Sequence, residues 1–244
     1  MSNTINLVEV FSSIQGEGEY VGCRQIFVRL AGCNLQCNYC DTPTSRQVSS
    51  TCRVEGHAGQ RDFIEMKNPV NTEELARVIN GLLDKPHHSV SFTGGEPLCQ
   101  ADALKQVAGK IKGTIYLETN GTLPKELDKV IDNIDVISMD IKLPFMTGRP
   151  LWEEHRQFLE LALTKDVFVK LVIDAGIDIS HFDQAVQLVA AVSTEIPLIL
   201  QPVTPINDCK AIEADQVIKL QDRALNILKN VKVIPQTHKF LGQL

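Results

Sequence analysis

The chain has 244 residues, of which 43% are hydrophobic and 22% are charged. These proportions are typical of a globular protein, so they exclude intrinsic disorder and a fibrous structure, and the length suits one large domain or two small ones. The net charge of -6 and the pI near 5.5 argue against nucleic acid as a partner. No signal peptide and no run of roughly 18 apolar residues is visible, so we expect a cytoplasmic protein without a membrane partner.

In chain order, the first predicted strand spans residues 25–32 (QIFVRLAG) and leads directly into the sequence CNLQCNYCD. The polar residues 43–70 follow, and we interpret them as an insertion without firm structure. Residues 71–83 then carry apolar residues at helical spacing, with Asn71 and Glu74 placed like an N-cap and its N3 partner. The first strand and its helix are therefore predicted to be separated by the insertion.

From residue 88 onward, short β-branched or apolar runs alternate with helix-like segments. This alternation predicts an α/β fold with six or seven parallel strands, in a single domain over residues 1–244. Functional residues of such folds collect at the carboxyl ends of the strands, where this chain places charged or amide side chains. We expect a shared pocket there, although strand ends are also polar simply because loops are solvated. The predicted strands are 88–92, 114–118, 135–140, 167–173, 198–203 and 231–236.

Three of the seven cysteines lie within eight residues, which suggests a metal site and not a secreted disulfide framework. Cys33, Cys37 and Cys40 stand at positions i, i+4 and i+7 directly after a predicted strand. Three thiolates on one loop can hold three irons of a four-iron cluster and leave the fourth iron open, as a catalytic site requires. The alternative is a structural zinc site with Cys52 or His57 as the fourth ligand, although the usual second pair of cysteines is missing.

The segment TGGEP at residues 93–97 is the second motif, and it also follows a predicted strand. Two adjacent glycines let the backbone approach a ligand closely, and Glu96 then offers a carboxylate. Taken alone, TGG is equally consistent with an ordinary tight turn. Its occurrence beside the cysteine-rich loop favours a ligand site.

Together these motifs resemble those of the radical S-adenosylmethionine (SAM) superfamily. The three-cysteine spacing, with the aromatic Tyr39 before the last cysteine, resembles its cluster motif, and TGGEP resembles its second motif. The resemblance implies an incomplete (β/α)6-type parallel barrel. It also implies a [4Fe–4S] cluster on Cys33, Cys37 and Cys40, whose open iron chelates SAM and cleaves it to a 5′-deoxyadenosyl radical.

A narrower resemblance lies in the segments 12–22 (SSIQGEGEYVG), 29–37 (RLAGCNLQC), 40–42 (CDT) and 236–244 (QTHKFLGQL). They are similar to the 7-carboxy-7-deazaguanine synthase family of the queuosine and deazapurine pathway. The likeness covers most of the chain apart from residues 43–70. It implies a homodimeric carbon–nitrogen lyase that contracts the ring of 6-carboxy-5,6,7,8-tetrahydropterin with loss of ammonia. The reductant is expected to be of the flavodoxin or ferredoxin type.

The family resemblance also implies roles for individual residues. Mg²⁺ is expected at Thr42, between the protein and the substrate carboxylate. The substrate is expected to meet the C-terminal α-carboxylate of Leu244 as well as several side chains. The implied SAM-binding residues are Tyr39, Asp41, Gly95, Glu96, Glu118, Ser138, Asp140, Lys142 and Gln201, and the implied substrate-binding residues are Ile14, Gln15, Gly16, Glu17, Arg29, Thr93, His238 and Leu244.

Several of these positions also have an ordinary structural interpretation. Arg29 is a good bidentate partner for a carboxylate, but an arginine in a strand can also reach a surface ion pair. Asp41 and Thr42 could form a simple hydroxyl or Asx turn. The family often has Ser-Pro-Lys where this chain has Ser-Met-Asp at residues 138–140, so Lys142 is expected to supply the cation.

Two other functions stay open at this point. A glycyl-radical enzyme activase shares the cysteine spacing and the small size but acts on a partner protein. A non-catalytic iron–sulfur electron carrier would need no pocket of substrate size. A pocket that fits a pterin would distinguish the first interpretation from both.

We predict that replacing Cys33, Cys37 or Cys40 with Ala abolishes cluster assembly and SAM cleavage, because the three thiolates share one task. Cys99→Ala should leave both intact, since this residue lies outside the motif. Iron content and 5′-deoxyadenosine release measure the two effects. Four irons per chain in the Cys37→Ala protein would contradict the assignment.

Overall fold

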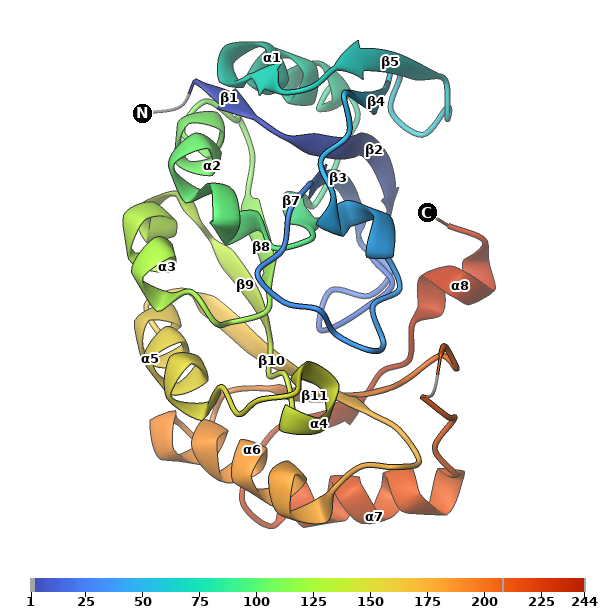
Figure 1. Cartoon of the computed structure of the whole chain (residues 1–244), viewed down its shortest axis with the longest axis vertical. Helices are drawn as coiled ribbons and strands as arrows, with labels where there is room; N and C mark the ends of the chain where they lie inside the picture. The colour runs from blue at the N-terminus through green and yellow to red at the C-terminus, as the bar shows by residue number, and fades with distance from the viewer. Residues whose placement is uncertain (1–2, 208, 244) are drawn as a thin grey trace.

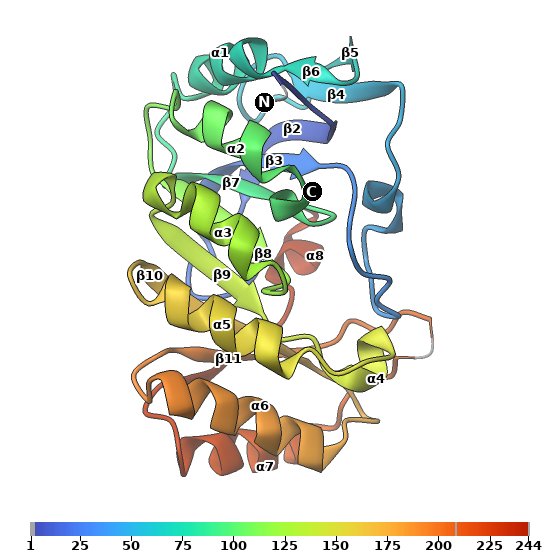
Figure 2. The same ribbon diagram turned by 60° about the vertical axis from the view of Figure 1, so that its left-hand side comes forward.

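The architecture is one large open sheet with helices on its outer face (Figures 1 and 2). The structure is a computed structural model that describes residues 3–207 and 209–243. The described strands of this sheet follow the order β12-β11-β10-β9-β8-β7-β3-β2-β4-β5. They are β2 (Leu7–Ile14), β3 (Arg24–Leu30), β4 (Thr51–Glu55), β5 (Phe63–Lys67), β7 (Ser89–Gly94), β8 (Ile115–Thr119), β9 (Val136–Asp140), β10 (Asp166–Ile173), β11 (Leu198–Pro202) and β12 (Val231–Val233).

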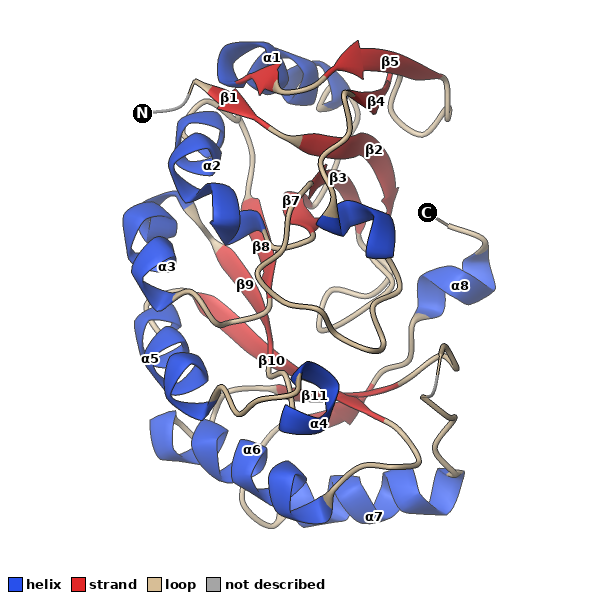
Figure 3. Ribbon diagram, viewed as in Figure 1, coloured by secondary structure: helices blue, strands red, loops and turns tan. Residues whose placement is uncertain are grey.

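The helices form an outer layer around the strands, as Figure 3 shows by colour. Helices α2, α3, α5 and α6 pack in sequence along this layer. No helix in the described part of the chain is long and apolar enough to cross a membrane. The α-helices are α1 (Thr72–Leu82), α2 (Ala101–Ala108), α3 (Pro124–Val130), α4 (Pro144–Thr147), α5 (Trp152–Ala162), α6 (Ile179–Val192), α7 (Ala214–Leu225) and α8 (Thr237–Leu241); the short elements are β1 (Thr4–Ile5), β6 (Val70–Asn71) and the 3-10 helices η1 (Pro43–Arg46), η2 (Pro97–Gln100) and η3 (Ile131–Asn133).

The parallel core contains β3 and β7 to β12, and each of these strands runs parallel to its neighbours within that set. The predicted number of parallel strands is therefore confirmed. The two ends of the sheet, β12 and β5, do not pair with each other, so the barrel is incomplete as expected. Apolar side chains on the outward face of each strand meet the helices, which explains the apolar runs in the sequence.

Alternate residues of the same strands point into the barrel. Near the amino ends of the strands, Tyr116, Val136, Phe168 and Ile199 form a separate buried cluster, against which the ring of Tyr20 packs. This cluster fills one end of the barrel interior. The polar residues further along the same strands are therefore left to line the carboxyl end.

Residues 43–70 are more structured than predicted, and the prediction of an insertion without firm structure is wrong. After η1, the segment forms the antiparallel hairpin β4–β5, and β4 pairs in parallel with β2. Cys52 and Val54 are buried while Arg53 between them is exposed, as expected for a strand with one face on the core. The many charged side chains of this hairpin mask the alternation in the sequence.

The first strand of the sheet was also missed. Residues Leu7–Ile14 form β2, which pairs antiparallel with β3, so the predicted strand at residues 25–32 is not the first one. The predicted cap of the next helix is confirmed, because the Asn71 side chain accepts hydrogen bonds from the backbone N–H groups of Glu73 and Glu74.

We expect Leu117→Ala to lower the free energy of unfolding by about 2–5 kcal/mol, because this fully buried side chain lies on the central strand β8. Leu225→Ala is the control, since Leu225 is 46% exposed and should cost far less. Urea unfolding of both cluster-free proteins measures the difference. Equal midpoints for the two variants would contradict this view of the core.

Candidate active site

A cavity of about 550 Å³ opens at the carboxyl ends of the parallel strands. Its wall includes Glu118 from β8, Asp140 from β9, Lys170 from β10 and Gln201 from β11. The loop that follows β3 covers the cavity from the front (Figure 1). The polar strand ends therefore do surround one shared pocket, as the sequence predicted.

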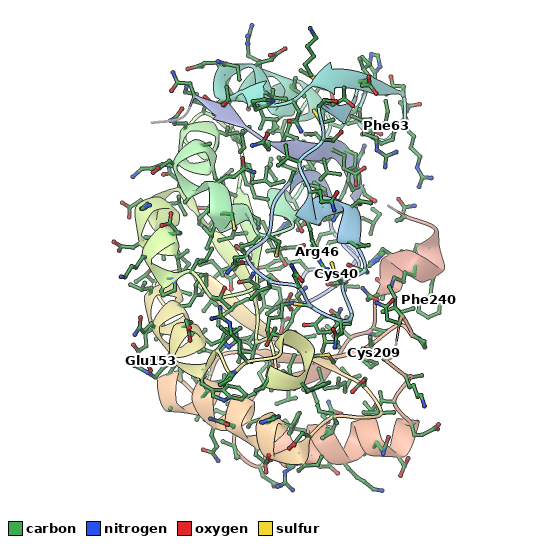
Figure 4. The ribbon with its side chains drawn as sticks, in the orientation of Figure 1. Cys40, Arg46, Phe63, Glu153, Cys209 and Phe240 are labelled. Carbon is green, nitrogen blue, oxygen red and sulfur yellow. The ribbon has the colours of Figure 1, made fainter. Side chains whose placement is uncertain are left out.

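The loop from Gly32 to Asp41 contributes three cysteines to this cavity. Cys33, Cys37 and Cys40 are free, partly buried thiols, and all three line it. The guanidinium of Arg46 donates to the Cys37 carbonyl at 2.6 Å, which ties the loop to η1. Figure 4 shows Cys40 and Arg46 in this region, in front of the strands.

The candidate zinc ligands lie elsewhere. Cys52 is buried in the hairpin strand β4, and His57 is an exposed residue whose Nδ1 lies 2.6 Å from an oxygen of Asp62. Neither residue lines the cavity that holds the three cysteines. The geometry thus gives the zinc alternative no fourth ligand from these two positions.

The glycines of TGGEP line the cavity and make room for the cysteine loop. A Cβ on Gly94 would overlap the carbonyl oxygen of Leu30, and a Cβ on Gly95 would overlap that of Gly32. Gly94 also has a φ of +123°, which only glycine adopts readily. The two glycines therefore let β7 pass close to the chain that enters the cysteine loop.

Glu96 lines the cavity but is fully buried, and protein donors already hold its carboxylate. It accepts hydrogen bonds from the Leu98 N–H at 3.1 Å, the Thr119 hydroxyl at 2.8 Å and the Asn120 N–H at 2.7 Å. Burial raises the pKa of Glu96 to about 7, although these donors oppose the rise. Glu96 thus joins the TGGEP turn to the end of β8.

Opposite charges alternate across the cavity wall. The ammonium of Lys142 lies 3.0 Å from Asp140, and Lys170 lies 3.7 Å from Asp140 and 2.7 Å from Glu17. Burial opposes charge on both lysines, but Asp140 holds the pKa of each well above its usual value. Burial likewise raises the pKa of Glu17, yet Lys170 and Gln236 together lower it to about 2. Both lysines and Glu17 are therefore ionised at neutral pH.

The C-terminal segment closes another side of the cavity. The Gln236 side-chain amide donates to Glu17 at 2.8 Å and to Asp41 at 2.9 Å, and its Oε1 accepts from the Thr204 hydroxyl at 2.7 Å. The side chain of His238 lies so close to Gly16 that a Cβ there would overlap it. This segment therefore touches both the Gln-Gly-Glu loop and the cysteine loop.

Glu17, Asp41 and His238 each present one ligand atom within 4.8 Å of the other two, so they could contribute to a cation site. The Thr42 hydroxyl donates to Asp41 at 3.0 Å and also lies at the cavity. The hydroxyl or Asx turn expected here is not found in the described structure, because the Thr42 side chain bonds to Asp41 and makes no cap hydrogen bond to η1.

The residues expected to bind the substrate form hydrogen bonds with a residue expected to bind SAM. The Gln15 side-chain amide donates to Glu118 at 2.7 Å, and the Thr93 hydroxyl donates to the other oxygen of Glu118 at 2.8 Å. Arg29 donates from Nε to Glu9 at 2.9 Å and still lines the cavity. Arg29 therefore forms the ion pair that was its alternative interpretation, and it also lines the pocket.

The structure brings almost all of the predicted site residues to this cavity. Ser138 is the exception and a correction, because it is buried one layer below Asp140, beside the phenol of Tyr116. Leu244 lies outside the described residues. The predicted residues that line the cavity are Ile14, Gln15, Gly16, Glu17, Arg29, Cys33, Cys37, Tyr39, Cys40, Asp41, Thr42, Thr93, Gly95, Glu96, Glu118, Asp140, Lys142, Gln201 and His238.

Four more polar residues of the cavity stand at the predicted strand ends, although no individual role was expected for them: Asn120, Lys170, Thr204 and Gln236. Asn120 donates to the Asn34 side chain at 2.8 Å and so links β8 to the cysteine loop. Lys170 carried a signal, because it is a lysine within the otherwise apolar run VFVKLVI. Such a residue in a predicted parallel strand indicates a buried partner of opposite charge.

The chain was compared with models of known protein families, and the match is consistent with the cysteine loop and the open barrel. The model described as the Radical SAM superfamily matches residues 28–189, which is more than half of the chain. The chain therefore belongs to the radical SAM superfamily of enzymes.

Curated relatives define the family more narrowly. A 7-carboxy-7-deazaguanine synthase of Geobacter sulfurreducens is 44% identical over 98% of this chain and 97% of the relative. One from Archaeoglobus fulgidus is 35% identical over 97% of this chain and 98% of the relative. The chain is a member of the 7-carboxy-7-deazaguanine synthase family.

A solved structure supports the fold. The crystal structure of QueE from Escherichia coli matches with a TM-score of 0.64, and the match covers 96% of this chain and 95% of that one. The two sequences are 20% identical, so this likeness concerns the fold alone.

We expect Gly95→Ala to reduce the iron bound after anaerobic reconstitution, because the added Cβ must displace the backbone of the cysteine loop. Gly81→Ala is the matched control, since nothing lies within 4 Å of its Cβ position on α1. Circular dichroism should show both proteins folded. Full iron loading of Gly95→Ala would contradict the close approach of the two backbones.

Proposed function

We propose that the protein is a carbon–nitrogen lyase that converts 6-carboxy-5,6,7,8-tetrahydropterin into 7-carboxy-7-deazaguanine and ammonia in deazapurine biosynthesis. The observation that carries the proposal is one cavity in which three cysteines of a single loop and Arg29 both lie. Its volume of about 550 Å³ suits a small molecule beside a cofactor. Such a pocket supports this function over an activase that needs a protein groove, and over an electron carrier.

The residues present fit a [4Fe–4S] cluster and SAM. Three free thiols of one loop would hold three irons, and no fourth cysteine is found among the described residues that line the cavity. Gln201 lines the cavity, and its buried Oε1 has no hydrogen-bond partner in the described part of the chain, as expected of a group that awaits a ligand. When bound, the cluster and SAM supply the radical chemistry.

On the side of the cysteine loop, we assign SAM to the wall that runs from Glu96 to Gln201. Lys142 would meet the SAM carboxylate as a cation, because its ammonium lies 5.0 Å from the ring of Tyr39 within this loop. Glu118 would lie between SAM and the substrate, because two of the proposed substrate-binding residues, Gln15 and Thr93, donate hydrogen bonds to its two oxygens. The other SAM contacts proposed are Tyr39, Asp41, Gly95, Glu96, Asp140 and Gln201.

On the other side of the cavity, Arg29 would bind the substrate carboxylate. Its Nε is held by Glu9, and no described residue accepts a hydrogen bond from its two Nη nitrogens. Mg²⁺ would lie at Thr42, where Asp41 supplies negative charge. The remaining substrate contacts proposed are Ile14, Gln15, Gly16, Glu17, Thr93, His238 and Leu244.

We further propose that the chain acts as a single domain and as a homodimer in the cytoplasm, reduced by a flavodoxin- or ferredoxin-type protein. The homodimer and the reductant follow from the family resemblance. Sedimentation of the reconstituted protein tests the dimer.

The decisive experiment incubates reduced, reconstituted protein with SAM, Mg²⁺ and the carboxypterin under anaerobic conditions. We expect 7-carboxy-7-deazaguanine and ammonia, identified by mass spectrometry and an ammonia assay. SAM cleavage without any change in the pterin would overturn the proposed substrate while leaving the superfamily assignment intact.

Because the C-terminal segment contacts the Gly16 loop, we expect a C-terminal tag to raise the KM for the carboxypterin or to abolish turnover. An N-terminal tag should have little effect, and both proteins should bind equal iron. If the C-terminal tail has no role in the site, the two tagged proteins should have equal kinetics.

A further inference from the structure

A row of three charged residues crosses the sheet next to the cavity. Strand pairing places Glu9 of β2 opposite Arg29 of β3 on one side and opposite Arg53 of β4 on the other. Arg29 Nε donates to one oxygen of Glu9 at 2.9 Å. Arg53 donates to the other oxygen from Nε at 2.8 Å and from Nη2 at 2.5 Å. One carboxylate therefore bridges two guanidinium groups.

The three members of the row differ in their exposure to solvent. The side chains of Arg29 and Glu9 are 17% and 9% exposed, whereas that of Arg53 is 51% exposed. Arg29 also lies over the ring of Phe11 at 5.8 Å, and Arg53 lies over the ring of Phe63 at 4.6 Å. Each guanidinium is thus held by one carboxylate oxygen and one aromatic ring. Arg29 lines the cavity, whereas Arg53 lines a neighbouring hollow together with Glu9.

The charge balance of this row matters for an anionic ligand. Arg29 and Glu9 alone sum to zero, so Glu9 would cancel most of the attraction that Arg29 exerts on a carboxylate in the cavity. Arg53 brings the sum to +1. Glu65 of β5 stands opposite Arg53 in the strand register. No ion pair within 4.0 Å joins these two residues in the described structure, so the ion pair of Arg53 is the one with Glu9.

We propose that Arg53 is a specificity-determining residue that offsets the charge of Glu9 and so keeps the positive charge of Arg29 available for the substrate carboxylate. Glu9 fixes the direction of the Arg29 guanidinium, and Arg53 removes the electrostatic cost of having Glu9 there. This assigns a task to the hairpin β4–β5. The inference rests on the proposed function, since it concerns the carboxylate of that substrate.

The test compares wild-type protein, Arg53→Ala, and the double variant Glu9→Gln with Arg53→Ala. We expect Arg53→Ala to raise the KM for the carboxypterin by about 3- to 5-fold, a modest effect because the removed charge is half-exposed. The kcat and the uncoupled SAM cleavage should stay within about 2-fold of wild type, as Arg53 does not reach the cofactor side. The double variant should return to the wild-type KM, because it restores the sum of +1 and keeps an acceptor for Arg29.

A second readout separates charge from structure. A tetrahydropterin without the 6-carboxylate, used as a competitive inhibitor, should bind wild type and Arg53→Ala equally. Lys67→Ala is the matched control, because it removes an exposed cation from the same hairpin without touching Glu9. Its KM for the carboxypterin should not change.

Three results would overturn the inference while the proposed function stands. The first is an Arg53→Ala KM equal to that of Lys67→Ala. The second is an equal loss of affinity for the carboxypterin and the neutral inhibitor, which indicates a structural defect. The third is a double variant that stays as weak as Arg53→Ala. Wild-type protein that does not convert the carboxypterin at all would instead overturn the proposed function, and this inference with it.

Discussion

The cavity depends on how closely two backbones pass each other at the ends of β3 and β7. Any side chain at Gly94 or Gly95 would collide with carbonyl oxygens of the chain that leads into the cysteine loop. Because this contact is made by backbone atoms, it places the three cysteines relative to the sheet with little freedom. The same turn directs Glu96 inward, where it holds the end of β8. The close approach of these two backbones therefore positions both the cysteine loop and the end of β8.

The charged cavity wall is costly to bury, and it is not there for stability. Two lysines and two carboxylates lose most of their hydration in this wall, and ion pairs of this kind contribute little net stability. Their value lies in orientation, because each charge holds its neighbour in place. The barrel therefore offers fixed dipoles and charges to a charged cofactor instead of mobile water.

The parallel strands and most of the cavity could be predicted because both depend on local patterns. Apolar runs define the strands, and the residues just after them must lie at one edge. The sequence could not reveal how deep within the barrel each of these side chains lies. Ser138 and Asp140 share a direction, as expected from their spacing, but Ser138 lies two residues nearer the amino end of β9, in register with Phe168 of the buried cluster. The hairpin β4–β5 was missed because its stability comes from pairing with β2, which is distant in the sequence.

The docking of the C-terminal segment on the Gly16 loop also means that the two sides of the cavity are held by different parts of the chain. The Thr237 N–H donates to the Gly16 carbonyl at 2.9 Å, and Gln236 joins Glu17 to Asp41. The cysteine loop is held in addition by Arg46 and Asn120, which belong to other segments. Release of the C-terminal segment would therefore open the substrate side of the cavity while those contacts still hold the cysteine loop.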